Sequence, residues 1–120
     1  MLYTTGLKKN ADFQKVYRNG QSAANSLLVL YVCRREDETN RIGISVSKKV
    51  GNSVIRHRLK RLIKESYRLN EIKFDGGLDM IFIARPGARE AGFSDMERAV
   101  LHLMKKMKLF RDRDNEASQG

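Results

Sequence analysis

Residues 41–68 constrain the fold more than any other stretch, because their hydrophobic pattern changes from one period to another. Ile42, Ile44 and Val46 alternate with glycine or serine, and this period of two is typical of a strand that has one covered face. A glycine and Asn52 then interrupt the alternation. Asn52 is predicted to cap a helix, because its side-chain oxygen can accept a hydrogen bond from a free backbone N–H of the following turn.

The residues from Ser53 to about Leu69 repeat with the period of an amphipathic helix. At about 100° per residue, the apolar and the basic side chains fall on opposite faces. The predicted apolar face comprises Ile55, Leu59, Leu62, Ile63 and Leu69. The predicted basic face comprises Arg56, His57, Lys60, Arg61, Lys64 and Arg68, with Arg58 at its border.

Almost no acid balances the basic face of this predicted helix. Glu65 is the only acidic residue between residues 41 and 68, and like charges four residues apart, such as Lys60 and Lys64, repel each other. Two further cations, Lys48 and Lys49, precede the helix. A charge run is often only a solvated surface, but same-sign clustering opposite an apolar face favours a binding site for a polyanion.

The composition of the whole chain supports a polyanionic partner. Its 120 residues suit one domain with one core, and 24 Lys and Arg against 14 Asp and Glu give a net charge of +10. Such a charge points to nucleic acid or an anionic membrane surface, but the longest apolar run, residues 27–33, is far short of the ~20 residues that span a bilayer. The first ten residues lack a signal-peptide segment and Cys33 is the only cysteine, so we expect a cytoplasmic protein.

The sequence before this stretch predicts one more helix. Residues 1–9 show no periodicity, and residues 10–19 read as a short helix that Asn10 caps and Gly20 ends. One face of this helix carries Phe13, Val16 and Tyr17. From pattern alone, packing of these aromatic rings against a sheet is favoured over a binding role.

The strands predict an α+β fold with a single sheet of about four strands. Residues 27–33 and 41–47 flank a polar turn at 36–40 and are predicted to form a hairpin. Residues 21–26 are a candidate edge strand, and residues 78–84 form another apolar strand. The strand, helix and strand between residues 41 and 84 have the spacing of a βαβ unit with a parallel pair. The predicted element order is α-β-β-β-α-β-α.

The last predicted helix begins at a capping box of Ser94 and Glu97 and runs to about Phe110. Its apolar face, which is expected to be core, comprises Met96, Ala99, Val100, Leu103, Met104 and Met107. Residues 111–120 are predicted to be a disordered tail. Residues 1–110 therefore form the single predicted domain.

The chain lacks the local motifs of a catalytic site. A metal-dependent nuclease requires clustered carboxylates. The acids of this chain are dispersed, and Glu65 and Asp79 each lack an acidic neighbour. His57 and His102 fall on different predicted helices, and no phosphate-binding loop, CxxC pair or GxSxG motif occurs. We therefore expect no catalytic and no metal-ligating residues on the protein, and the chain resembles a binding protein.

RNA is the favoured partner over DNA. A helix-turn-helix reader of DNA has a second helix just before its recognition helix, whereas the element before the basic helix here is a predicted strand. Aromatic residues near cations, namely Phe13, Tyr17 and Tyr31, suit single-stranded nucleic acid that stacks on rings. The residues alone thus predict an RNA-binding α+β domain.

The run KKVGNSVIRHRLKRLIKE resembles the signature of the bacterial ribonuclease P protein subunit, in which an RxR helix follows a KKxGNxV turn. The blocks LKKNADFQKVYRNG, LLVLYV, RIGISVSKKVGN and MIFIARPGA resemble the same family in the same order, so the similarity covers Leu7 to about Phe110. The family commonly has Asn between the two arginines, where this chain has His57; Arg56 and Arg58 are retained.

The resemblance implies a small protein bound to a large catalytic RNA, together removing the 5′ leader of precursor tRNA. It implies that Mg²⁺ bound by the RNA performs the cleavage, and that the βαβ unit has a left-handed crossover, against the usual right-handed rule. It implies neither a membrane nor a DNA partner. The alternative is a structural or ribosomal-type RNA-binding protein that has no part in cleavage.

The resemblance also assigns two sets of contact residues. Contacts to the RNA subunit are expected from Lys48, Lys49, Asn52, Arg56, His57, Arg58, Lys60, Arg61, Lys64 and Arg68. Contacts to the leader are expected in a cleft between the first helix and the sheet, from Phe13, Lys15, Tyr17 and Tyr31.

Overall fold

Five strands form one mixed sheet in the order β1-β4-β5-β3-β2 in the computed structural model, which describes residues 1–111. The strands are β1 (Thr4–Gly6), β2 (Gln21–Ala24), β3 (Leu28–Arg34), β4 (Asn40–Ser45) and β5 (Leu78–Ala84). The helices are α1 (Asn10–Asn19), α2 (Ser53–Asn70) and α3 (Phe93–Lys106), with short 3₁₀ turns at Glu71–Lys73 and Pro86–Ala88. The α+β class is confirmed, with one strand more than predicted.

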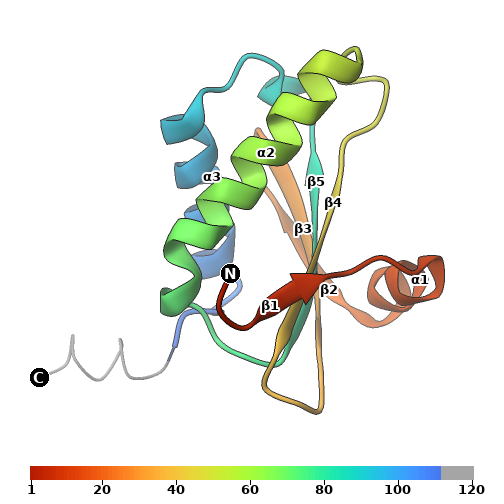
Figure 1. Ribbon diagram of the computed structural model, residues 1–120, viewed down its shortest axis with the longest axis vertical. Coiled ribbons are helices and arrows are strands. Elements are labelled where there is room, and N and C mark those ends of the chain that lie inside the picture. Colours follow the sequence, from red (N-terminus) through yellow and green to blue (C-terminus); the bar gives the residue numbers. More distant parts are fainter. Residues whose placement is uncertain (112–120) are drawn as a thin grey trace, which may run out of the picture.

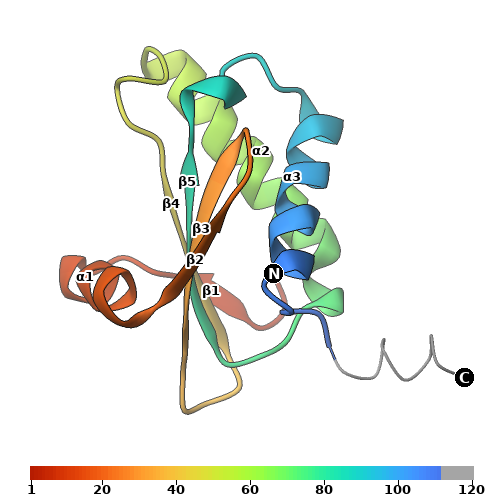
Figure 2. The same ribbon diagram turned by 180° about the vertical axis from the view of Figure 1, so that it is seen from behind.

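The helices cover the sheet unequally. Figure 1 shows the sheet nearly edge-on, with α2 and α3 on one face and α1 on the other, and Figure 2 shows the same layers from behind. The larger core fills the space between the sheet and the α2–α3 pair, where Leu30, Phe82 and Leu103 are fully buried. A smaller core of Val16, Ile81 and their neighbours lies under α1.

The predicted βαβ unit is present, and its crossover is left-handed. β4 and β5 pair in parallel, with Ile42 beside Met80, and α2 connects them. In Figure 1 both strands run upward, α2 lies to the left of the sheet, and β4 lies nearer the viewer than β5. Seen from the helix side, the chain therefore moves leftward from β4 to β5, which is the left-handed sense that the family resemblance implies.

The predicted hairpin between residues 27–33 and 41–47 is wrong. β5 lies between β3 and β4, and it pairs antiparallel with β3 and parallel with β4. β5 is central because both of its faces are apolar: Phe82 packs in the larger core and Ile81 in the smaller one. The predicted edge strand at 21–26 is confirmed as β2, which pairs antiparallel with β3.

The first strand, β1, has no sequence pattern and was not predicted. It pairs in parallel with β4 at the edge of the sheet. The buried carboxylate of Glu71, at the end of α2, accepts hydrogen bonds from the backbone N–H groups of Leu2 (2.7 Å) and Tyr3 (3.2 Å) and from the hydroxyl of Thr4. Thr4 also bonds the buried hydroxyl of Tyr67 at 2.9 Å. The Tyr67 side chain of α2 and the Glu71 side chain just after the helix therefore hold this strand in place.

The predicted bounds of α1 are confirmed, but its predicted cap is wrong. Lys9 occupies the N-cap position without a side-chain hydrogen bond, and Asn10 is the first helical residue. Gly20 follows the helix in an extended conformation, with a φ of −84°. A Cβ atom there would lie 2.6 Å from the carbonyl oxygens of Val16 and Val32, so the glycine permits close approach of α1 to β3.

The predicted capping box of α3 is also wrong. The helix starts at Phe93, and the backbone N–H of Gly92 donates to the carboxylate of Asp95 at 3.2 Å. Glu97 instead accepts a hydrogen bond from Asn70 at 3.0 Å. The helix ends at Lys106, short of the predicted Phe110.

Most predicted core positions are confirmed. The buried residues of α3 are Met96, Ala99, Val100, Leu103 and Met104, with Met107 partly buried. Those of the predicted α2 face are Leu59 and Ile63, with Ile55 and Leu62 partly buried. Leu69, however, is 52% exposed. The last buried turn of α2 uses polar and aromatic residues instead, namely Ser66, Tyr67 and Asn70.

The predicted tail lies mostly outside the described residues. Residue 111 is described, and the Arg111 guanidinium donates to the carbonyl oxygen of Phe74 at 2.8 Å and lies over the ring of Tyr3. Residues 112–120 are not described. No helix within residues 1–111 is both long enough and apolar enough to cross a membrane.

Candidate nucleic-acid interface

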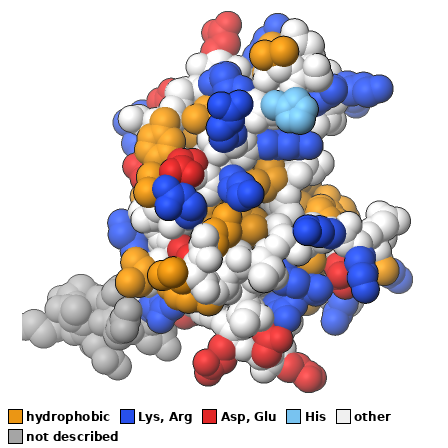
Figure 3. Space-filling view, viewed as in Figure 1, with side chains coloured by type: hydrophobic (Ala, Val, Ile, Leu, Met, Phe, Trp, Pro, Cys, Tyr) orange, Lys and Arg blue, Asp and Glu red, His pale blue; other side chains and the backbone are white. Residues whose placement is uncertain are grey.

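The basic face predicted for α2 points away from the core. The side chains of Lys60, Arg61, Lys64 and His57 are exposed, while the opposite side of the helix packs on the sheet and α3. Figure 3 shows cationic side chains following α2 across this face of the molecule. We call the exposed residues His57, Lys60, Arg61 and Lys64, with Lys48 and Lys49 in the turn before the helix, the α2 surface.

The turn that introduces α2 is built as the sequence predicts. Asn52 is the N-cap, and its side-chain oxygen accepts a hydrogen bond from the backbone N–H of Ile55 at 3.0 Å. Lys48 and Lys49 are exposed. Such a cap is worth about 1 kcal/mol. Asn52 therefore fixes the start of the helix that carries the α2 surface.

Arg58 differs from the other predicted RNA contacts. Its guanidinium donates two hydrogen bonds to backbone carbonyl oxygens, that of Ala91 at 2.8 Å and that of Arg89 at 2.6 Å. These acceptors lie more than 30 residues further along the chain. No sequence pattern could have identified them, since only the fold brings the residue 85–92 loop to α2.

Arg68, in the last turn of α2, is paired. It donates two hydrogen bonds to the carboxylate of Glu65, one from Nε at 3.0 Å. The pair raises the pKa of Arg68 and lowers that of Glu65. Because both side chains are nearly half exposed, at 47% and 43%, the pair adds little stability. Arg68 is therefore the predicted contact whose charge the protein itself partly neutralises.

Three predicted leader contacts lie together on the opposite face of the sheet. The rings of Tyr17 and Tyr31 meet edge to face with centroids 5.0 Å apart, and the ring of Phe13 lies 6.4 Å from that of Tyr17. All three are half-buried around the smaller core. Burial, and then the neighbouring Tyr31, raises the pKa of Tyr17. We call these three rings the aromatic surface.

Gly43 supports the aromatic surface and was not predicted as a site residue. Gly43 of β4 and Tyr31 of β3 lie on either side of Ile81 of β5, which pairs with both of them. A Cβ atom on Gly43 would lie 2.5 Å from Cζ of Phe13. The absence of a side chain therefore makes room for the Phe13 ring against the sheet.

Lys15 does not join the aromatic surface. Four residues of a helix span roughly one turn, so Phe13 and Tyr17 share a side of α1, and Lys15 projects from the other side. There it borders a hollow with Arg35, Arg41 and Asp79.

A chain of ion pairs ties α1 to the sheet beside Lys15. Arg41 of β4 donates two hydrogen bonds to Asp79 of β5, at 2.7 and 2.8 Å, and another to Asp12 of α1 at 3.1 Å. Arg35 donates to the same Asp79 at 3.1 Å. Burial alone would raise the pKa of Asp79, but the bonds from Arg41 and Arg35 outweigh it, and the net shift is downward. These ion pairs hold α1 in position against the sheet.

The α2 surface and the aromatic surface meet at the β1 edge of the sheet. A hollow of about 720 Å³ is bordered on one side by Phe13 and Gly43. On the other side it is bordered by His57, Lys60, Arg61 and Lys64 of α2. A single strand of nucleic acid in this hollow could thus contact the Phe13 ring and the α2 cations at once.

Within residues 1–111, no group of three or more His, Cys, Asp or Glu side chains is arranged to hold a metal ion. His57 and His102 lie on different helices, as predicted. The described part of the chain therefore offers cations, rings and hydrogen-bond donors, which are the groups that bind nucleic acid.

Comparison with known proteins decides the family. A family model described as Ribonuclease P matches residues 1–108. The chain belongs to the ribonuclease P protein family. The ribonuclease P protein component of Alkaliphilus metalliredigens is 57% identical over 103 residues, which are 86% of this chain and 93% of that protein. Membership assigns the chain to tRNA 5′ maturation, as a protein component of an endoribonuclease complex with an RNA partner.

Solved ribonuclease P proteins share the fold. The protein from Staphylococcus aureus superposes with a TM-score of 0.82 at 39% identity, covering 88% of this chain and 97% of that one. The protein from Thermotoga maritima gives a TM-score of 0.78 at 27% identity, covering 83% and 94%. The sheet and helices of the ribonuclease P protein are therefore retained across these relatives.

Proposed function

We propose that this ribonuclease P protein binds the RNA subunit of the enzyme through the α2 surface and the 5′ leader of precursor tRNA through the aromatic surface. The observation that carries the proposal is the division of the site: Lys48, Lys49, Lys60, Arg61 and Lys64, which form no ion pair within residues 1–111, lie on one side of the sheet, and the half-buried rings lie on the other. Phosphates favour the first and unpaired bases the second.

The protein's contribution to cleavage is binding and orientation. Cations of the α2 surface neutralise phosphates of the folded RNA and fix the protein on it. The rings then stack on leader bases, so that the precursor binds more tightly than the mature tRNA, which has no leader. Because the proposed role is in tRNA processing, we place the protein in the cytoplasm.

The bond-breaking chemistry is assigned to the RNA subunit. Mg²⁺ bound there would stabilise the charge on the phosphate under attack. The described residues of the protein do not form a ligand set for such an ion, so we assign it no ligand on this chain. A structural RNA-binding protein without a role in cleavage is the competing function, since it would share the α2 surface.

Reconstitution tests the proposal. Cleavage of a 5′-extended precursor tRNA at low Mg²⁺ is measured with the protein alone, with a bacterial ribonuclease P RNA alone and with both. We expect cleavage at the mature 5′ end only in the mixture. RNA binding without stimulated cleavage would instead favour the structural protein, and cleavage by the protein alone would refute the binding role.

Two substitutions test the division into surfaces. Arg61→Ala removes an exposed cation from α2 and is expected to weaken assembly with the RNA subunit. Tyr17→Ala removes a ring on the other face, and it is expected to spare assembly and weaken binding of the precursor but not of the mature tRNA. Equal effects of the two substitutions on assembly would contradict the two-surface arrangement.

A further inference from the structure

Arg58 lies at the border of the α2 surface, yet its side chain is committed to the protein itself. The two hydrogen bonds to the carbonyl oxygens of Ala91 and Arg89 use both terminal nitrogens of the guanidinium. The residue is also half-buried, unlike its neighbours His57 and Lys60. These bonds hold the residue 85–92 loop against the N-terminal half of α2.

The loop is fixed from its other side as well. The backbone N–H of Arg85 donates to the carbonyl oxygen of Leu27 at 2.8 Å, and its guanidinium donates to that of Asn25 at 2.8 Å. Ala88 is fully buried and Ala91 is 7% exposed. The loop is therefore a fixed part of the surface whose position depends on contacts at both ends.

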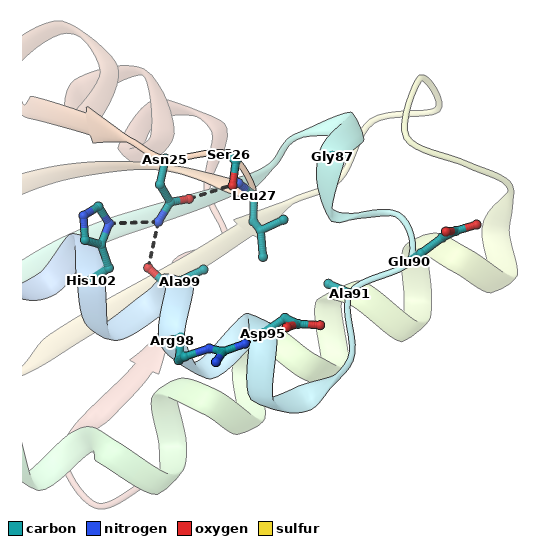
Figure 4. Close-up of a pocket in the computed structure, with 10 residues that line it drawn as sticks. All are labelled: Asn25, Ser26, Leu27, Gly87, Glu90, Ala91, Asp95, Arg98, Ala99 and His102. Atoms are coloured by element: carbon teal, nitrogen blue, oxygen red, sulfur yellow. Dashed lines mark hydrogen bonds and ion pairs between the residues drawn. The ribbon is translucent and has the colours of Figure 1, made fainter.

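The two charged residues at the middle of the loop are placed differently. Glu90 borders a hollow of about 570 Å³ between the loop, the β2–β3 turn and α3, whereas Arg89 is not among the residues that line it. Figure 4 shows this hollow, with Gly87, Glu90 and Ala91 on one wall and Asp95 and His102 on α3. In Figure 4 the Glu90 carboxylate points out of this hollow, away from the labelled residues of α3, and Glu90 forms no ion pair within residues 1–111.

Arg89 belongs to the α2 side. Its carbonyl oxygen lies 2.6 Å from the Arg58 side chain of α2. Its own side chain is exposed, and within residues 1–111 it forms no ion pair. An unpaired cation beside a row of cations extends the same positive surface.

We propose that Arg58 is a positioning residue that holds the residue 85–92 loop against α2, and that Arg89 on this loop contacts an RNA phosphate. The RNA-binding surface then continues past the helix onto the loop. This inference rests on the proposed function, because it concerns the same RNA subunit. It changes the role of Arg58, which the family resemblance assigned to a direct contact.

The chemistry of arginine separates the two roles of Arg58. A lysine keeps the charge and can replace a simple phosphate contact. It lacks the planar fork that spans two carbonyl oxygens, so it does not reproduce the link to the loop. Arg58→Lys therefore preserves binding if Arg58 meets phosphate, and weakens binding if Arg58 positions Arg89.

The experiment measures RNA-subunit affinity against salt for the full-length protein and for Arg89→Ala, Arg58→Lys, their double variant and Lys106→Ala. Lys106 is an exposed cation at the opposite end of α3 from the loop, and it controls for net charge. Losing one phosphate contact costs about 5-fold in affinity at ~0.15 M salt and lowers the log–log salt slope by about 0.7–0.9.

We expect that loss for Arg89→Ala and a loss of at least similar size for Arg58→Lys, with no further loss in the double variant. Lys106→Ala is expected to bind within 2-fold of the unaltered protein. Arg89→Ala behaving like Lys106→Ala, or Arg58→Lys binding like the unaltered protein, overturns the inference alone. Failure of the unaltered protein to bind the RNA overturns the proposed function and this inference with it.

Amide hydrogen exchange on the free protein supplies a readout that does not depend on RNA. The backbone N–H groups of Ala88, Arg89 and Ala91 donate to carbonyl oxygens within the loop, at 2.8–3.1 Å. In Arg58→Lys these amides should exchange at least 10-fold faster, while they stay unchanged in Lys106→Ala. Unchanged exchange in Arg58→Lys would show that the guanidinium does not hold the loop.

Discussion

Gly43→Ala tests whether the geometry of the aromatic surface matters for leader binding. The added methyl group would lie 2.5 Å from Cζ and 2.9 Å from Cε2 of Phe13. Ordinary carbon contacts are about 3.5–4 Å, so the ring has to move by about 1 Å. Because Phe13 is half-buried, it can tilt outward, and the cost to folding is expected at the low end of overpacking, about 1 kcal/mol.

The larger effect is expected on the leader. Stacking of one base on a ring is worth about 1–3 kcal/mol, and a displaced ring loses a good part of it. We expect Gly43→Ala to reduce the affinity of the assembled enzyme for precursor tRNA by about 10-fold, the equivalent of about 1.4 kcal/mol. Affinity for mature tRNA should not change, because it has no leader to stack.

Gly6→Ala is the matched control. It is also a glycine-to-alanine change, in β1 at the same edge of the sheet, but the new methyl group meets only the flexible end of Lys8, at 3.3 Å. Both substitutions reduce the entropy of the unfolded chain in the same way. Equilibrium binding of precursor and mature tRNA is measured for both variants. If their precursor-to-mature affinity ratios are equal, the seating of Phe13 on Gly43 has no part in leader binding.

Three further predictions concern stability and charge. The pKa of Asp79 is lowered in the folded protein, so its contribution to stability is present above the unfolded value of about 3.9 and is lost as the pH falls through the lower folded value. Asp79→Asn should therefore be less stable than the unaltered protein at pH 7, with the gap closing in denaturant titrations towards pH 2; a constant gap would contradict the ion-pair explanation. Asn52→Ala should lower the free energy of unfolding by about 1 kcal/mol through loss of the helix cap, and a change below ~0.3 kcal/mol would argue against that cap. If about six phosphates meet the α2 surface, affinity for the RNA subunit should fall on the order of 10³-fold between 50 and 200 mM salt; filter binding that hardly depends on salt would contradict an electrostatic contact.

Local patterns were enough to predict the central part of the fold. The strand at β4, the Asn52 cap and the amphipathic α2 each depend on neighbours within a few residues, so the period of the sequence contains the information. The clustering of cations on one face follows from the same geometry. The parallel pairing of β4 with β5 was predicted too, because a helix of this length between two strands favours it.

Features that depend on distant residues could not be predicted. The polar turn after β3 suggested a hairpin of β3 with β4. In the sheet, however, β5 lies between these two strands, because β5 has apolar residues for both faces of the sheet. β1 has no pattern of its own, and Glu71, nearly 70 residues away, holds it. Lys15, which the family resemblance assigned to the leader together with the rings, lies beside Arg41 and Asp79, and its contact with the leader stays a prediction.

The buried polar groups explain why this protein suits a binding role. Glu71 and Asp79 are the buried carboxylates of the described chain, and both are occupied: Glu71 by the backbone N–H groups of the two residues before β1, and Asp79 by two arginines. Within residues 1–111 no buried side-chain nitrogen or oxygen lacks a hydrogen-bond partner. A general base or acid needs a free position towards substrate, which these groups do not have. The two buried carboxylates hold β1 and α1 in place, whereas the cations of the α2 surface and the three half-buried rings remain accessible for contact with RNA.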